Sequence, residues 1–318
     1  MSFSGMVKKE LSEHIDKARH CRLAELSAVI GTCGYLKREP DGSDVLMIRT
    51  ENEAILRKCF TLLKKTFNIE AVISDEKQSS SRRGKVYLAG VPGAEASAGI
   101  LEAVKVLPDG PSGQLRTVRN SLITQRDCCR RAFIRGAFLV SGSISDPEKG
   151  YHFEIVFPDE KRAEHVQELV RSFGIDARIV ARKKSYVLYV KEGSQIVDLL
   201  GLMGADTALF DLENIRILKE MRNSVNRKVN CEAANINKTV SAAVKQIDDI
   251  RLIENLKGLD SLSEGLSQVA RLRLQYPDAT LKELGFMLDP QVGKSGVNHR
   301  LRRLGELADE LREKEEEQ

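Results

Sequence analysis

The stretch that decides the fold is CRRAFIRGAFLVSG, which spans Cys129 to Gly142. A related stretch, CRLAELSAVIGTCG, spans Cys21 to Gly34, so the two lie 108 positions apart (129 − 21 = 108). In this register Cys21, Arg22, Ala24 and Gly34 recur as Cys129, Arg130, Ala132 and Gly142. Both stretches end in glycine, the usual residue just past the end of a helix. We therefore expect two related helices.

Small residues recur at helical spacing in both stretches. The first contains Ala24, Ala28 and Gly31, and the second contains Ala132 and Gly136. Two helices with small residues on one face can approach closely and pack ridge into groove. The sequence therefore predicts a duplicated domain built around a pair of packed helices.

The segments that follow each helix also repeat in order. Phe67–Ile73 (FNIEAVI) matches Phe173–Ile179 (FGIDARI) at an offset of 106 (173 − 67 = 106), which one small insertion or deletion explains. Hydrophobic periodicity predicts helix–strand–strand–helix–strand–strand–helix twice within residues 1–205, in repeats of about 1–107 and 114–205. The expected fold class is α+β, with a duplicated αββαββα domain first and an all-α domain after it.

Composition places the chain among ordinary soluble globular proteins. Its 318 residues allow two or three domains, and 42% of them are hydrophobic while 30% are charged. A net charge of +4 permits nucleic-acid binding without requiring it. No apolar run approaches the roughly 18 residues of a membrane span, and residues 1–17 lack the apolar segment of a signal peptide. We expect a cytoplasmic protein without a membrane partner.

Cysteine and histidine usage argues against a metal site. The six cysteines contain no Cys-x-x-Cys pair, a pattern typical of reduced cytosolic thiols. Adjacent Cys128 and Cys129 would form a strained chelate. The histidines without partners at ligand spacing are His14, His20, His152 and His165. Because a phosphate-binding loop and a nucleophile elbow are also missing, we expect no metal, no cofactor and no enzymatic activity.

A polar connector is expected at residues 206–250. Asp206–Asn223 has the spacing of a helix, and Asn226–Ile247 is polar and basic. Its basic residues include Arg227, Lys228 and Lys238. The second segment is either a solvated linker or an arm that lies on an anionic partner, and a basic polar stretch fits both.

The sequence pattern of residues 251–318 predicts three helices. Ser261 with Glu264, and Thr280 with Glu283, have the spacing of capping boxes, and Ser295 is placed to cap a third helix. The last two helices, at about 279–312, form a helix-turn-helix pattern. The turn, residues 289–294, is longer than the usual three or four residues.

The third helix has an exposed face suited to DNA. Arginine can pair with guanine and asparagine with adenine in the major groove, while neighbouring positive charges bind phosphate. A glycine near the helix start would allow the backbone to approach DNA closely. The candidate DNA-binding residues are Lys294, Ser295, Gly296, Asn298, His299, Arg300, Arg302 and Arg303, with Arg227, Lys228 and Lys238 as weaker candidates. The alternative is a solvated helix end.

Arginines also gather around the second helix of the duplicated pair. They are Arg116, Arg119, Arg126, Arg130, Arg131 and Arg135. They form either a second nucleic-acid or partner surface or, because side chains at such mixed spacing must point in several directions, a partly structural set.

Two resemblances sharpen these expectations. Leu26–Gly34 and Ile134–Gly142 resemble the nine-residue motif of LAGLIDADG homing endonucleases. Over essentially its full length the chain resembles the WhiA family of bacterial sporulation and cell-division regulators. The most specific marks are NRKVNCEAAN from Asn226 and VGKSGVNHRL from Val292. The resemblance implies a LAGLIDADG-like domain followed by a helix-turn-helix.

The motif has lost its catalytic acids. In active endonucleases of this fold, an acid before the final glycine of each motif holds the divalent metal, whereas this chain has Cys33 and Ser141 there. A hard ion such as Mg²⁺ requires anionic oxygen, so a thiol and a hydroxyl cannot replace the two carboxylates. We expect no catalytic residues and no cleavage.

The resulting hypothesis is a sequence-specific, non-nucleolytic regulator that binds double-stranded DNA at the nucleoid. The family resemblance suggests roles in cell division, chromosome segregation or sporulation. The N-terminal domain would add a surface for protein partners or DNA. The alternative is a protein- or ligand-binding adaptor in cell division with only accessory DNA binding.

Overall fold

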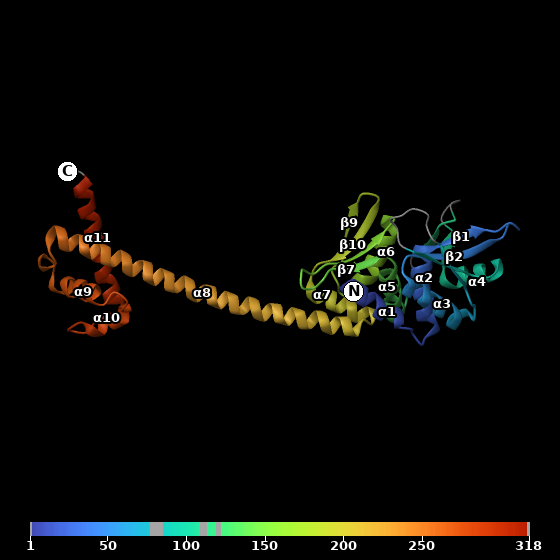
Figure 1. Cartoon of the computed structure of the whole chain (residues 1–318), viewed down its shortest axis with the longest axis horizontal. Coiled ribbons are helices and arrows are strands. Elements are labelled where there is room, and N and C mark those ends of the chain that lie inside the picture. Colours follow the sequence, from blue (N-terminus) through green and yellow to red (C-terminus); the bar gives the residue numbers. More distant parts are fainter. Residues whose placement is uncertain (1, 77–84, 109–112, 119–121, 317–318) are drawn as a thin grey trace. The chain divides into compact units, whose positions relative to one another are not determined.

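The structure is a computed structural model that describes residues 2–76, 85–108, 113–118 and 122–316 (Figure 1). It divides into two compact units, Met1–Lys219 and Glu220–Gln318. The division falls within residues 206–250, which we expected to form a separate connector. Within the described residues, no helix combines the length and the apolar character needed to cross a membrane.

The first repeat follows a leading helix, α1 (Phe3–Glu13). Its elements are α2 (Arg19–Cys33), β1 (Gly34–Arg38), β2 (Asp44–Thr50), α3 (Glu53–Phe67), β3 (Val72–Glu76), β4 (Val86–Gly90) and α4 (Ala94–Val104). The strands form an antiparallel sheet in the order β1-β2-β4-β3. This element order is the predicted one.

The second repeat has the same plan. Its elements are α5 (Asp127–Ser141), β7 (Gly142–Ile144), β8 (Phe153–Phe157), α6 (Glu160–Arg171), β9 (Arg178–Arg182), β10 (Ser185–Val190) and α7 (Gly193–Met203). The sheet order β7-β8-β10-β9 repeats that of the first sheet. The duplicated αββαββα domain is therefore confirmed.

Three short elements between the repeats were not predicted. They are β5 (Val106–Pro108), β6 (Leu115–Thr117) and a 3-10 helix, η1 (Leu122–Thr124). Each has three residues, so none is long enough to show a hydrophobic period. The pairing of β5 with β6 places Thr117 beside α2.

The helices α2 and α5 pack against each other through small residues. A Cβ added at Gly136 would lie 2.7 Å from the Glu25 carbonyl oxygen and 3.0 Å from the Ala28 Cβ. Gly31 does not serve this contact, because a Cβ there would overlap the Thr117 hydroxyl of β6. The helix pair was predicted, but only part of its small-residue face lies at the crossing.

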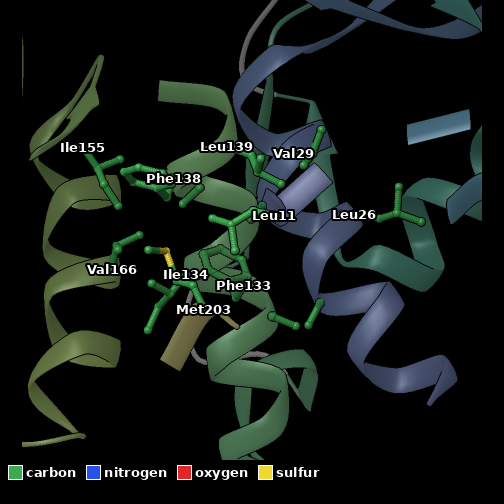
Figure 2. Packing of buried hydrophobic residues seen from close by; sticks show 14 of the residues in the cluster. Leu11, Leu26, Val29, Phe133, Ile134, Phe138, Leu139, Ile155, Val166 and Met203 are labelled. Atoms are coloured by element: carbon green, nitrogen blue, oxygen red, sulfur yellow. The ribbon is translucent and has the colours of Figure 1, made fainter. Parts of the chain in front are cut away.

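The hydrophobic core of the first unit extends from this helix pair into both repeats. Figure 2 shows Phe133 and Phe138 of α5 among side chains from several other elements. Phe138 stacks on Phe153 of β8 with 5.1 Å between ring centroids. The remaining labelled core residues are Leu11, Leu26, Val29, Ile134, Leu139, Ile155, Val166 and Met203.

One continuous helix, α8 (Asp206–Lys257), replaces the expected helix and polar linker. The segment contains neither glycine nor proline, so nothing in its backbone chemistry ends the helix. Exposed polar side chains are compatible with a helix, so residues 226–247, which we expected to form a solvated linker or an arm, continue the helix that begins at Asp206.

The second unit also contains the predicted small helical domain. A 3-10 helix, η2 (Leu259–Ser261), precedes α9 (Glu264–Gln275), α10 (Leu281–Met287) and α11 (Lys294–Glu316). Their core includes Ile250, Ile253, Val269, Leu284, Val297, Leu301, Leu304 and Ala308. Val297, Leu301, Leu304 and Ala308 form the buried face of α11.

Only one of the predicted caps has the expected geometry. The Thr280 hydroxyl accepts from the Glu283 N–H (3.3 Å), and the Glu283 carboxylate accepts from the Thr280 N–H (2.7 Å). Ser261 instead donates its hydroxyl to the Gly258 carbonyl and ends η2, so α9 begins later. Ser295 lies inside the first turn of α11, which begins at Lys294.

Candidate functional site

The turn between α10 and α11 is held by backbone contacts. The Val292 N–H donates to the Gly285 carbonyl over 3.0 Å. A Cβ at Gly285 would overlap the Val292 carbonyl, and one at Gly296 would overlap the Val292 side chain. Both glycines therefore let the turn pack onto the helices, which gives Gly296 a packing role where we had expected an approach to DNA.

One face of α11 carries most of the candidate DNA-binding side chains. Its exposed residues include Lys294, Ser295, Asn298, His299, Arg302 and Arg303. Lys294, Asn298 and Arg302 form one row and Ser295, His299 and Arg303 an adjacent row, both on the side away from buried Val297 and Leu301. The face combines donors for base edges with charges for phosphate.

Arg302 and Arg303 both pair with Glu306. Arg302 Nε lies 3.4 Å from one carboxylate oxygen, and Arg303 Nη1 donates to the other over 2.9 Å. The arginine side chains remain 79% and 64% exposed. Exposed ion pairs contribute only about 0–1 kcal/mol, so both guanidinium groups can exchange Glu306 for a phosphate or a base.

Arg300 does not share this exposed face. It is half-buried, and its Nη1 donates to the Gly265 carbonyl of α9 over 3.3 Å. Gly265 lies directly under the guanidinium group, since a Cβ there would be 3.2 Å from Arg300 Cζ. Arg300 therefore holds α9 against α11.

The weaker candidates lie on α8. Arg227, Lys228 and Lys238 are all exposed. Arg227 and Lys238 are eleven positions apart (238 − 227 = 11), about three helical turns, so they share a face. Lys228 points about 100° away from Arg227. The basic segment that we expected to be a linker or an arm is therefore part of a helix, and two of its three candidates share one face.

The degenerate motif positions are the last residues of the two packed helices. The Cys33 thiol donates to the Val29 carbonyl over 3.1 Å, and the Ser141 hydroxyl donates to the Ala137 carbonyl over 3.4 Å. Burial raises the pKa of Cys33 to about 12, so this thiol is neutral at physiological pH. Neither side chain offers an anionic oxygen to a hard metal ion.

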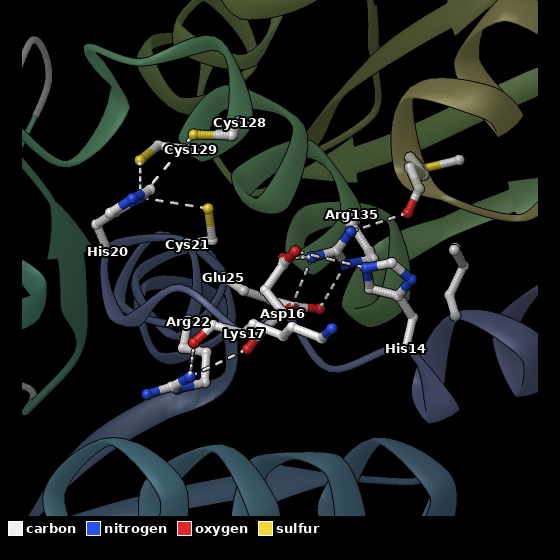
Figure 3. Close-up of polar contacts among 12 residues, drawn as sticks. His14, Asp16, Lys17, His20, Cys21, Arg22, Glu25, Cys128, Cys129 and Arg135 are labelled. Atoms are coloured by element: carbon white, nitrogen blue, oxygen red, sulfur yellow. Dashed lines mark hydrogen bonds and ion pairs between the residues drawn. The ribbon is translucent and has the colours of Figure 1, made fainter.

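A buried charge network lies between the two helices (Figure 3). Arg135 donates from Nε and Nη2 to the two carboxylate oxygens of Glu25, over 3.1 and 3.2 Å. Its Nη1 donates to the Met203 carbonyl over 3.0 Å. Lys58 is also ion-paired with Glu25, and Asp16 with Arg135. The network joins the first repeat to the second.

These contacts give several of the clustered arginines structural roles. Arg130 donates to the Thr124 carbonyl over 3.1 Å, and Arg131 lies over the Phe173 ring at 5.6 Å. Arg135 is 3% exposed. Arg119 lies outside the residues that the structure describes. Arg135 is thus structural, in agreement with one of the two alternatives.

The structure also assembles a group that sequence spacing did not predict. His20, Cys21, Cys128 and Cys129 place their side-chain donor atoms within 4.8 Å of one another (Figure 3). We had expected no metal-ligand partners for His20 and a strained chelate at Cys128 and Cys129, whereas the structure gathers both cysteines of the second repeat and Cys21 of the first around His20. The offset of 108 was the available signal, since it aligns His20 with Cys128 (128 − 20 = 108).

Comparison with known proteins covers nearly the whole chain. Family models match at residues 19–107 (WhiA N-terminal LAGLIDADG-like domain), 130–222 (WhiA LAGLIDADG-like domain) and 225–308 (WhiA C-terminal HTH domain). A Lachnoclostridium phytofermentans protein, named probable cell division protein WhiA, is 53% identical over 98% of this chain and 100% of its own length. The chain belongs to the WhiA family.

Further relatives agree with this assignment. An Alkaliphilus oremlandii WhiA of the same name is 48% identical over 98% of each chain. The crystal structure of full-length DUF199/WhiA from Thermatoga maritima has a TM-score of 0.59 at 24% identity and covers 98% of this chain and 99% of its own. The WhiA fold therefore extends through both units of this chain.

Proposed function

We propose that this WhiA-family chain is a sequence-specific DNA-binding regulator of cell division that does not cut DNA. The exposed face of α11, where Asn298 and His299 stand beside two solvent-exposed arginines, carries the proposal. We further propose roles in chromosome segregation or sporulation, and action in the cytoplasm on nucleoid DNA. The family membership and the HTH match at residues 225–308 support this direction.

Within this proposal the α11 residues divide into three roles. Asn298 and Arg302 lie one turn apart on the exposed face and would contact base edges. Lys294 and Arg303 would add phosphate contacts, whose strength falls as salt rises. Arg300 and Gly296 would act indirectly, because they position α9 and the turn.

We base the proposed absence of DNA cleavage on the last residues of α2 and α5. Cys33 and Ser141 donate hydrogen bonds within their own helices and carry no negative charge. Incubation of supercoiled DNA with the protein and Mg²⁺ or Mn²⁺ should leave it uncut. Sustained cutting that a chelator abolishes would overturn this part of the proposal.

The test of DNA binding is a titration at several salt concentrations. The double variant Arg302→Ala/Arg303→Ala should bind its DNA at least about tenfold more weakly, and it should lower the salt slope by about 1 because the phosphate contact of Arg303 is lost. The matched control is Arg251→Ala/Arg271→Ala, which removes the same charge from exposed positions on α8 and α9. Equal affinity and slope in both variants would contradict the assignment.

Asn298→Ala distinguishes base readout from general attraction to DNA. Loss of a bidentate asparagine–adenine contact costs about 1–3 kcal/mol of discrimination at one base pair. The preference of the protein for one base at that position should therefore weaken, while the salt dependence of its affinity stays unchanged. A uniform loss across all sequences would argue against sequence-specific readout by Asn298.

A cavity in the first unit favours a second candidate function, the ligand- or partner-binding adaptor. It has a volume of about 500 Å³, within the range of small-molecule sites. Its lining includes Ala28 and Gly31 of α2, Phe133 and Ala137 of α5, and Asp159, which caps the start of α6. An adaptor should keep its cellular activity when α11 carries Arg302→Ala/Arg303→Ala, whereas a DNA-binding regulator should lose it.

A further inference from the structure

The two packed helices carry adjacent pairs of metal-binding side chains in their first turns. His20 and Cys21 follow Arg19 at the start of α2, and Cys128 and Cys129 follow Asp127 at the start of α5. Subtracting 108 from the second pair gives the first, so the pairs occupy equivalent places in the duplication. The packing of the two helices brings the pairs together at one end of the helix pair (Figure 3).

The four donor atoms are close enough to surround a single ion. His20 Nδ1 lies 3.2 Å from Cys129 Sγ, 3.3 Å from Cys21 Sγ and 3.9 Å from Cys128 Sγ. Tetrahedral zinc, with Zn–S of about 2.3 Å and Zn–N of about 2.0 Å, places neighbouring ligand atoms roughly 3.5–3.8 Å apart. Small side-chain adjustments would therefore convert this cluster into a tetrahedron.

The surroundings suit thiolates bound to a divalent cation. Three thiolates, one neutral imidazole and a divalent ion carry a net charge of −1. The N-termini of α2 and α5 meet at the cluster, and their partial positive charges stabilise a centre with a net negative charge. Cys21 and Cys129 are buried, whereas Cys128 is exposed, so one edge remains open for an ion to enter.

Since a metal binds the thiolate, binding must release protons and become tighter as pH rises. The four donors are three sulfur atoms and one imidazole nitrogen, without a carboxylate. Such donors suit a soft or borderline metal ion, whereas Mg²⁺ and Ca²⁺ require oxygen ligands.

We propose that His20, Cys21, Cys128 and Cys129 form a Cys₃His site for a thiophilic divalent ion of the zinc class. The ion would hold the two repeats together where their motif helices begin. Cys21 and Cys33 are twelve residues apart (33 − 21 = 12), so the site lies about 18 Å along α2 from the degenerate catalytic position. The proposed site is thus separate from the lost nuclease centre and does not depend on DNA binding.

Metal analysis and a Co²⁺ titration of the full-length chain test the site. The chain should be purified without a polyhistidine tag and under reducing conditions, and should contain or take up one Zn²⁺ per molecule. Stripped protein titrated with Co²⁺ should develop thiolate-to-cobalt charge-transfer bands and the ligand-field bands of a tetrahedral ion, which Zn²⁺ then abolishes. Uptake should release protons and raise the thermal midpoint of unfolding.

Variants distinguish this site from adventitious binding. Cys128→Ser and His20→Asn change less buried positions. Each should weaken Co²⁺ binding by more than the 10–100-fold that is typical of losing a residue that only hydrogen-bonds to a metal ligand. Cys231→Ser, at an exposed cysteine of α8, is the control and should leave the bands and the stoichiometry unchanged.

Two results would overturn the proposal. The first is failure of the reduced protein to bind Co²⁺ or Zn²⁺ stoichiometrically; if a disulfide between Cys21 and Cys128 or Cys129 also forms readily, the cluster is a redox pair. The second is binding that persists in Cys128→Ser but disappears in Cys231→Ser.

Discussion

Arg135 on α5 donates from Nε to a carboxylate oxygen of Glu25 on α2 over 3.1 Å, and both side chains are shielded from solvent. The pair does not follow the duplication. At an offset of 108, Glu25 aligns with Phe133, and Arg135 aligns with Ser27. The two repeats therefore share a backbone plan, but the positions equivalent to this ion pair hold Phe133 and Ser27, which cannot form a second one.

Replacing one partner of this pair should strongly destabilise the first unit. Arg135→Leu would leave Glu25 buried with Lys58 as its remaining ion-pair partner, and breaking a buried pair costs about 3–5 kcal/mol. Urea unfolding followed by circular dichroism measures the loss. Arg131→Leu is the control, because it removes only an exposed cation–π contact with Phe173, worth about 0.5–1 kcal/mol. Equal losses in the two variants would contradict a special role for the Glu25 pair.

Gly136→Ala should separate α2 from α5. The added Cβ would lie 2.7 Å from the Glu25 carbonyl, and backbone cannot move aside as easily as a flexible side chain. Overpacking of this kind costs about 1–3 kcal/mol. Gly99→Ala on α4 is a matched control in open space, where alanine should stabilise the helix by about 0.5–1 kcal/mol. Opposite shifts of the thermal midpoint are expected, and a stabilising Gly136→Ala would rule out the close crossing.

Acid should weaken the first unit through Asp16. Its hydrogen bond from His14 and the neighbouring Arg135 lower the pKa of Asp16 from 3.8 to about 2. Because the folded-state pKa is the lower one, the contribution of Asp16 is complete above about pH 4 and is lost as pH falls towards 2. The shift corresponds to at most about 2 kcal/mol. Asp16→Asn should remove this part of the acid dependence of unfolding, and an unchanged pH profile would count against the ion pair.

The capping box of α10 predicts a local loss of stability in the second unit. Thr280→Ala removes the hydroxyl that accepts from the Glu283 N–H, at a typical cost of about 1 kcal/mol. Faster hydrogen exchange at the start of α10 should report the loss. Ser261→Ala should change exchange at the start of α9 much less, because Ser261 does not cap that helix. A larger effect of Ser261→Ala than of Thr280→Ala would contradict this assignment and would indicate that Ser261 caps α9.

The duplicated fold could be predicted because its signals are local and repeated. Hydrophobic spacing encodes the 3.6-residue period of a helix and the two-residue period of a strand, and the repeat presents the same order twice. Only the first part of α8, Asp206–Asn223, was predicted as a helix, because the polar and basic composition of the segment after it also fits a linker, although that segment lacks glycine and proline. The three helices of the second unit were predicted, but two of their three caps were not formed as expected, since short serine motifs fit turns as well as helix starts.

By itself, the sequence determined the two repeats, the helix-turn-helix, the exposed face around Asn298 and Arg302, and the loss of acids at Cys33 and Ser141. Only the tertiary structure decided which distant side chains meet. It placed Arg300 against α9, Gly31 against Thr117, Arg135 against Glu25, and His20 beside Cys128 and Cys129. The physical reason is that local periodicity sets which face of an element is buried, whereas the partner across a packed interface depends on how two elements cross.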